Sequence, residues 1–142
     1  MIKALVNNSW KLFDINELQP GTIVYDFETG LYETLRTKDH KPILLKPHLD
    51  RLFNSAKSTS LKPLFHRKKV ESMIIQVIES SPKLDQRVRV LLVPDKVIIY
   101  TMPLDLDYDI YSGVSVITVK AKRDTPETVS YTHLTLPTIL RV

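Results

Sequence analysis

Apolar residues recur at helical spacing in two segments of the chain. In the first, a proline at position 47 suits the opening turn of a helix, which should end near 58–60. Its buried face follows the i, i+3, i+4, i+7 pattern through Leu49, Leu52, Phe53 and Ala56. The second segment, 67–79, has the same period, and its face holds Val70, Met73, Ile74, Val77 and Ile78. Both segments are predicted to be core-packed helices, with Met73 in that core rather than at a cofactor.

Shorter segments show the apolar runs or alternation of strands. Asn-Asn-Ser, Pro-Gly and Asp-Lys pairs mark turns between several of them, and residues 38–41 read as the turn of a hairpin. The predicted strands are 3–6, 10–13, 22–25, 31–37, 43–45, 88–92, 97–101 and 114–119. The pattern therefore predicts an α+β domain in which antiparallel strands pack with two helices.

Size and composition narrow the class of protein. The 142 residues are 43% hydrophobic and 25% charged, which suits one globular domain. No apolar run approaches the roughly 20 residues of a membrane span, so we expect a cytoplasmic protein without a membrane partner. The absence of cysteine excludes a disulfide framework, a thiolate zinc site and a cysteine nucleophile.

Several binding motifs are missing. Only three glycines are present, and neither a P-loop nor a G-x-G-x-x-G sequence occurs, so a glycine loop for phosphate is excluded. His40, His48 and His66 stand among polar neighbours without carboxylates at metal spacing, and we therefore expect no metal site.

The charge balance leaves one alternative function open. The net charge is +4, and the densest basic run is HRKK at 66–69. A non-enzymatic domain that binds RNA or an acidic partner would use such residues. The basic residues are spread evenly, however, and a short run at the start of a helix is usually a solvated surface, so we expect no nucleic-acid partner.

Three residues near the first predicted helix have ordinary structural explanations. Tyr32 can be a sheet aromatic and Glu33 a surface carboxylate. Arg51 lies about 200° from Leu49 on a helical wheel, on the side away from the apolar stripe. Residue by residue, Arg51 is predicted to face solvent.

The order of these pieces is more informative. The chain reads GLYETLRT, then KPILL, then KPHLDRLFNSA. This order resembles the amino-terminal domain of the class IV aminotransferases, the fold-type IV pyridoxal phosphate enzymes that include branched-chain and D-amino acid aminotransferases and aminodeoxychorismate lyase. The resemblance runs from about residue 2 to residue 127, and HLDRLFNSA is its most specific part.

The resemblance implies a cofactor and three site residues. The intact enzyme would use pyridoxal 5'-phosphate, and Arg51 takes the position of the arginine that binds the cofactor phosphate. A guanidinium suits this task because it stays charged and donates forked hydrogen bonds. Tyr32 takes a position where the family places an aromatic residue against the substrate, and Arg36 one that often lines the same pocket.

The resemblance also implies partners, and it has departures. Such enzymes are homodimers that act on amino acids or on aminodeoxychorismate. Residues 28–30 read Glu-Thr-Gly where the family usually has Gly-Asp-Gly. The strand VRVLLVPDK lacks the Arg-Gly ending of many D-amino acid aminotransferases and is more similar to aminodeoxychorismate lyases.

The family's catalytic lysine is missing from its expected place. In this family a lysine forms the Schiff base with the cofactor and moves the substrate's α-proton. Alignment with the family pattern puts that lysine near Val129, where no lysine stands. Lys120 and Lys122 are the nearest lysines and are poor substitutes. We therefore expect this chain to be inactive.

The sequence after residue 127 has a different character. From residue 128 it reads TVSYTHLTLPTILRV, which resembles the translation of a transposon-based sequencing-library adapter. We therefore expect residues 1–127 to be the amino-terminal domain of a class IV enzyme and residues 128–142 to be a non-native tail.

Overall fold

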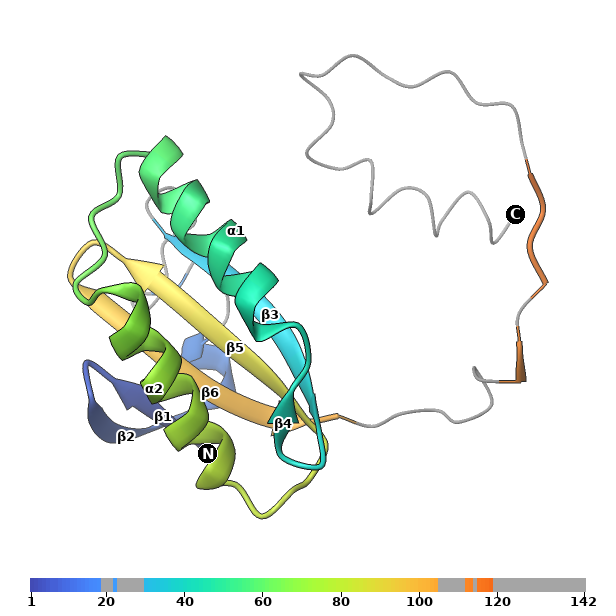
Figure 1. Ribbon diagram of the computed structural model, residues 1–142. Coiled ribbons are helices and arrows are strands. Elements are labelled where there is room, and N and C mark those ends of the chain that lie inside the picture. The colour runs from blue at the N-terminus through green and yellow to red at the C-terminus, as the bar shows by residue number, and fades with distance from the viewer. Residues whose placement is uncertain (19–21, 23–29, 105–111, 114, 119–142) are drawn as a thin grey trace. The chain divides into compact units, whose positions relative to one another are not determined.

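The computed structural model describes residues 1–18, 22, 30–104, 112, 113 and 115–118. The chain divides into two compact units, Met1–Asp105 and Leu106–Val142. All the helices and strands described below belong to the first unit (Figure 1). The predicted turn at 20–21 and most of the predicted strand 22–25 lie outside the described residues.

The first unit is built on one six-stranded sheet with the order β2-β1-β6-β5-β3-β4. Its neighbouring strands pair antiparallel. The strands are β1 Ile2–Val6, β2 Ser9–Phe13, β3 Leu31–Lys38, β4 Lys41–Pro42, β5 Gln86–Val93 and β6 Lys96–Pro103. A short 3-10 helix, Ile15–Leu18, follows β2. With its two helices, the unit confirms the predicted α+β class.

Two hairpins turn through pairs of residues with positive φ. Asn7 and Asn8 join β1 to β2 with φ of 50° and 71°, and Asp39 and His40 join β3 to β4 with φ of 50° and 58°. Consecutive left-handed residues match the right-handed twist of the strands, and asparagine and aspartate tolerate this conformation best. The sequence signals at both turns are thus confirmed.

The predicted strand at 43–45 is wrong. The β4 strand comprises only Lys41–Pro42, and the first helix begins at Leu45, two residues before the proline. Ile43 N–H still donates to the Arg36 carbonyl at 2.9 Å, but Leu44 has φ of 54°. This left-handed residue turns the backbone out of the sheet and into the helix, so apolar content alone does not make these residues a strand.

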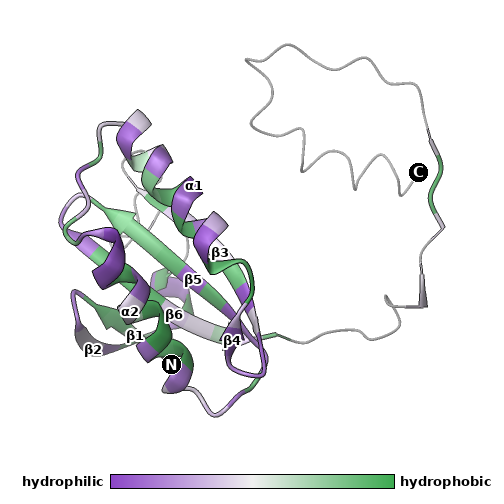
Figure 2. Cartoon of the chain, viewed as in Figure 1, coloured by the Kyte–Doolittle hydropathy of each residue, from purple (hydrophilic) through white to green (hydrophobic). Residues whose placement is uncertain are grey.

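Both helices pack on one face of the sheet (Figure 1). They are α1 Leu45–Ser58 and α2 Arg67–Glu79, and the predicted apolar faces are their buried faces (Figure 2). The core between helices and sheet includes Leu49, Leu52, Val70, Met73, Ile74, Val77 and Ile78, together with Leu35, Val88, Val90 and Leu92 from the strands. Met73 is fully buried, which confirms its core assignment.

A second apolar cluster covers part of the opposite face. It comprises Ala4, Val6, Leu18, Leu91, Val93, Ile98 and Tyr100. Because of it, β5 is buried on both faces along its second half, and Leu91 is not solvent-facing as strand alternation alone would suggest. None of the described helices is long and apolar enough to cross a membrane.

The predicted strand at 114–119 is not a strand in its described part. Residues 115–118 have no regular secondary structure, and Val116 and Ile117 are 77% and 68% exposed. Valine and isoleucine favour strands because they pack against neighbouring strands, and within the described residues no strand pairs with this segment.

Candidate functional site

The strand β3 carries candidate residues on both of its faces. Glu33 lies on the face that packs toward the helices, whereas Tyr32 and Arg36 project from the other face, as alternation along a strand requires. Glu33 is only 5% exposed, so its interpretation as a surface carboxylate is wrong. A carboxylate buried to this extent needs partners that satisfy its charge.

The helix α1 supplies those partners. His48 and Arg51 are three residues apart, so they share one side of the helix, and both reach Glu33. Arg51 Nε donates to Glu33 Oε1, and Arg51 Nη2 donates to Glu33 Oε2 at 2.7 Å. His48 Nδ1 lies 2.9 Å from the same Oε2. The cluster of Glu33, His48 and Arg51 is named the β3–α1 triad below.

Charge pairing decides the ionisation of the triad. Burial by itself would raise the pKa of Glu33, but hydrogen bonds from Arg51 and His48, together with their charges, bring this pKa below its ordinary value. The hydrogen bond and the charge of Glu33 raise the pKa of Arg51. Glu33 is therefore a carboxylate at neutral pH.

The hydrogen-bond chemistry also fixes the histidine tautomer. His48 Nδ1 faces Glu33 Oε2 at 2.9 Å and Arg51 Nη2 at 3.2 Å. A carboxylate only accepts and a guanidinium only donates, so Nδ1 can serve one of them at a time. A bare Nδ1 would direct its lone pair at the carboxylate oxygen. The favourable arrangement places the proton on Nδ1, from which it is donated to Glu33.

The triad leaves one edge of the guanidinium available for a ligand. Nε and Nη2 point to Glu33, and within the described part of the chain no acceptor is hydrogen-bonded to Nη1. The Arg51 side chain is 66% exposed, which agrees with its predicted position away from the apolar stripe. An accessible guanidinium anchored on one edge fits a phosphate, since a second fork of N–H donors remains.

Tyr32 and Arg36 do not join this triad, because they lie on the opposite face of β3. Tyr32 is 52% exposed, and the Arg89 guanidinium lies over its ring at 5.2 Å from the centroid. In the register of the sheet, Thr34 of β3 stands between them and pairs with Arg89. Thr34 Oγ1 and Arg89 Nε are buried without a hydrogen-bond partner among the described residues.

Sequence reasoning missed three members of these two groups. Glu33 and His48 lie within the motif segments, but only the contact between β3 and α1 shows that they meet Arg51. Arg89 is visible in the sequence as the polar residue between Val88 and Val90, which signals an outward position without indicating a neighbour. The predicted lysine position near Val129, and Lys120 and Lys122, lie outside the described residues.

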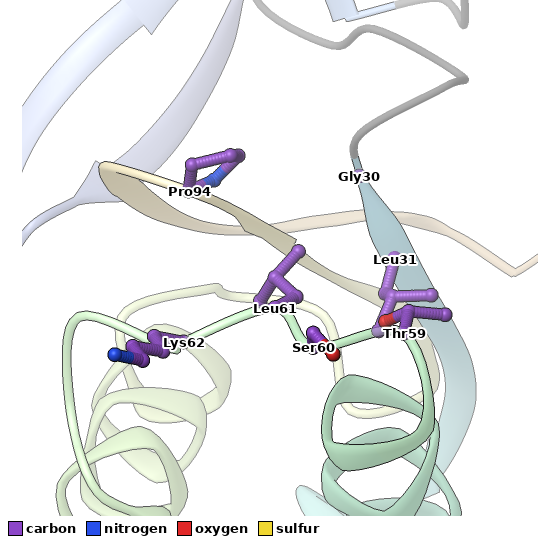
Figure 3. Close-up of a pocket in the computed structure, with 7 residues that line it drawn as sticks. All are labelled: Gly30, Leu31, Thr59, Ser60, Leu61, Lys62 and Pro94. Carbon is purple, nitrogen blue, oxygen red and sulfur yellow. The ribbon is translucent and has the colours of Figure 1, made fainter.

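A pocket of about 450 Å³ lies apart from both groups (Figure 3). It is lined by Gly30, Leu31, Thr59, Ser60, Leu61, Lys62 and Pro94, at the end of α1 and the turn between β5 and β6. Its polar groups include two hydroxyls and one lysine, and none of the triad residues lines it. The described residues contain no group of three or more His, Cys, Asp or Glu side chains that could hold a metal ion.

Solved structures share this fold. The branched-chain amino acid aminotransferase of Escherichia coli matches with a TM-score of 0.58 and 18% identity, over 72% of this chain and 40% of that one. The same enzyme of T.th., with pyridoxamine 5'-phosphate, gives a TM-score of 0.57, 18% identity and coverages of 73% and 40%. A Legionella pneumophila protein assigned as a 4-amino-4-deoxychorismate lyase gives 0.50, 20%, 56% and 34%.

At these identities the structures establish a common fold. This chain spans about two fifths of the length of the two aminotransferases. No curated protein matches the sequence. The alternative of an RNA-binding domain receives no support from these matches.

The family model described as amino-transferase class IV matches residues 30–141, which is most of the chain. This range contains the GLYETLRT and HLDRLFNSA segments as well as all three members of the β3–α1 triad. The sequence match and the shared fold agree, and the chain therefore belongs to the class IV aminotransferase family.

Proposed function

We propose that the chain is the amino-terminal domain of a pyridoxal-phosphate-dependent aminotransferase or aminodeoxychorismate lyase. Its substrates would be amino acids or aminodeoxychorismate. Family membership and the fold shared with both kinds of enzyme support this proposal. The intact enzyme is proposed to be a cytoplasmic homodimer that has neither nucleic acid nor a membrane as partner.

The Arg51 guanidinium is the observation that carries the proposal. It is permanently charged, largely exposed and anchored by one edge to a buried carboxylate. These properties suit the phosphate group of the cofactor, which would accept hydrogen bonds from the remaining edge. When bound, pyridoxal phosphate supplies an electron sink for charge that develops at the substrate's α-carbon. Arg51 would contribute by holding the phosphate in place.

Substrate contacts are proposed for Tyr32 and Arg36. The Arg89 guanidinium over the Tyr32 ring adds a cation that suits a substrate carboxylate. These residues and Arg51 belong to opposite faces of β3, so a cofactor with bound substrate would have to reach around that strand. The position of β3 next to the end of the sheet supports this arrangement, since β4 pairs only with Thr37 and Lys38.

The chain by itself is proposed to be inactive. Residues 1–127 would be native sequence, and the tail 128–142 would replace the segment that carries the Schiff-base lysine near Val129. Without that lysine neither the covalent attachment of the cofactor nor the transfer of the α-proton has its usual group. Transamination catalysed by the purified chain would contradict this part of the proposal.

Sequencing the source gene beyond codon 127 tests the proposal. We expect a lysine within a few codons and then a second domain, and finding VSYTHLTLPTILRV followed by a stop would refute the fragment hypothesis. In the completed enzyme, Arg51→Met should weaken cofactor binding by about tenfold or more, the worth of a charged hydrogen bond. Lys57→Met removes an exposed cation from the same helix and should leave the cofactor Kd, measured by equilibrium dialysis, unchanged.

A further inference from the structure

We propose that Glu33 and His48 are positioning residues that hold the guanidinium of Arg51 by its Nε and Nη2 edge and so present the Nη1 edge to a phosphate group. This inference rests on the proposed role of Arg51 in phosphate binding. It assigns a task to two residues that would not themselves touch the ligand.

The first argument is the contrast in mobility between the two ends of the ion pair. Glu33 sits in the middle of β3, where it is opposite Val90 of β5, and its side chain is 6% exposed. Its carboxylate is therefore fixed by the sheet. Arg51 projects from a helix surface and is 66% exposed. A long side chain in this setting would sample many rotamers, and the two-point contact with a fixed carboxylate removes most of that freedom.

The second argument concerns how the carboxylate is itself held. Glu33 Oε1 accepts from Arg51 Nε, and Oε2 accepts from both Arg51 Nη2 and His48 Nδ1. Three donors from one helix thus hold both oxygens of the carboxylate. His48 would keep the carboxylate plane aligned with the guanidinium while Arg51 exchanges water for phosphate.

The third argument is the sign of the electrostatic effect. A carboxylate close to an anion site repels the anion, so charge alone predicts that removal of Glu33 strengthens phosphate binding. Positioning predicts the opposite, because an unanchored Arg51 must lose its rotamer freedom when it binds. The two explanations therefore differ in the direction of the change and not merely in its size.

The test is a titration of the 142-residue chain with inorganic phosphate, followed by NMR of ¹⁵N-labelled arginine side chains. Arg51→Met assigns the Arg51 signals by their loss. In the wild-type chain, slow rotation of the guanidinium should give resolved Nη signals before phosphate is added, and those of Nη1 should shift during the titration. Glu33→Gln should average the Nη signals and weaken phosphate binding by about three- to tenfold, the cost of ordering one long side chain. His48→Gln should act in the same direction with a smaller effect.

Asp50→Asn is the matched control. Asp50 neighbours Arg51 in sequence, but it pairs with Lys46 at 3.0 Å and with Arg67. Loss of its charge should leave phosphate binding unchanged or slightly stronger. If Glu33→Gln binds phosphate as tightly as the wild-type chain or more tightly, the positioning role is refuted while the phosphate role of Arg51 stands. Phosphate shifts that are the same in the wild type and in Arg51→Met would refute both. Freely rotating wild-type Nη groups would refute the positioning role even if Glu33→Gln failed to fold.

Discussion

The stability of the β3–α1 triad provides a direct test of its geometry. In Arg51→Met, Glu33 remains 5% exposed but loses its two-point partner and keeps only His48. Breaking a buried pair costs about 3–5 kcal/mol, whereas an exposed pair is worth about 0.2–1 kcal/mol. Arg51 is 66% exposed, so water can fill its place. We therefore expect an intermediate loss of about 1–3 kcal/mol in the free energy of unfolding.

The double variant Glu33→Gln/Arg51→Met isolates the pair. It removes the buried charge together with its partner, and we expect it to be more stable than Arg51→Met alone, with a coupling energy of about 1–2 kcal/mol. Urea unfolding of the four chains in the cycle, followed by circular dichroism, measures this coupling. Equal stabilities for the single and double variants would show that Glu33 does not depend on Arg51 for its charge.

The same cycle should depend on pH. The pKa of Glu33 is lowered in the folded chain because its hydrogen bonds to Arg51 and His48 outweigh the effect of burial. Its stabilising contribution is complete above the ordinary glutamate pKa of about 4.3 and is lost as the pH falls through the lowered folded value. The difference in stability between the wild-type chain and Arg51→Met should therefore shrink at acidic pH. A difference that persists after Glu33 is protonated would refute an electrostatic origin.

Two further predictions concern the scaffold that carries the triad. Met73→Ala should cost about 2–5 kcal/mol in urea unfolding, because Met73 is fully buried between α2 and the sheet, whereas the exposed Glu71→Ala on the same helix should stay within about 0.5 kcal/mol of the wild type. Gln86→Leu should cost about 1–3 kcal/mol, since the Gln86 amide donates to the buried Ile78 carbonyl at 3.2 Å and to the Lys83 carbonyl at 2.5 Å. Wild-type stability in Gln86→Leu would mean that water or rearranged donors satisfy both carbonyls.

The sequence by itself determined most of the regular elements of this protein. The helical period from 67 to 79 matches α2 at both ends, because five apolar residues on one face leave no other way to bury them. The two hairpin turns were equally legible, since asparagine and aspartate tolerate the left-handed backbone that tight turns require. The order of the GLYETLRT and HLDRLFNSA segments was sufficient on its own to indicate the family.

Local patterns failed where neighbours distant in sequence decide the outcome. Residues 43–45 are apolar enough for a strand, but the left-handed Leu44 directs the chain into α1 instead. Residues 115–118 have the composition of a strand and no partner among the described strands. Strand formation depends on an adjacent edge, and a single sequence does not reveal which edges are available.

The candidate site shows the same division between sequence and tertiary structure. Arg51 could be singled out from its motif, and its exposure from its position on the helical wheel. Glu33, however, looks like any strand glutamate until α1 packs on β3 and covers it. Burial then makes a partner necessary, and the three-residue spacing of His48 and Arg51 on the helix provides two. The sequence determined which residues could form an ion cluster, and the packing of helix on sheet decided that they do, because only burial turns a tolerated pair into a required one.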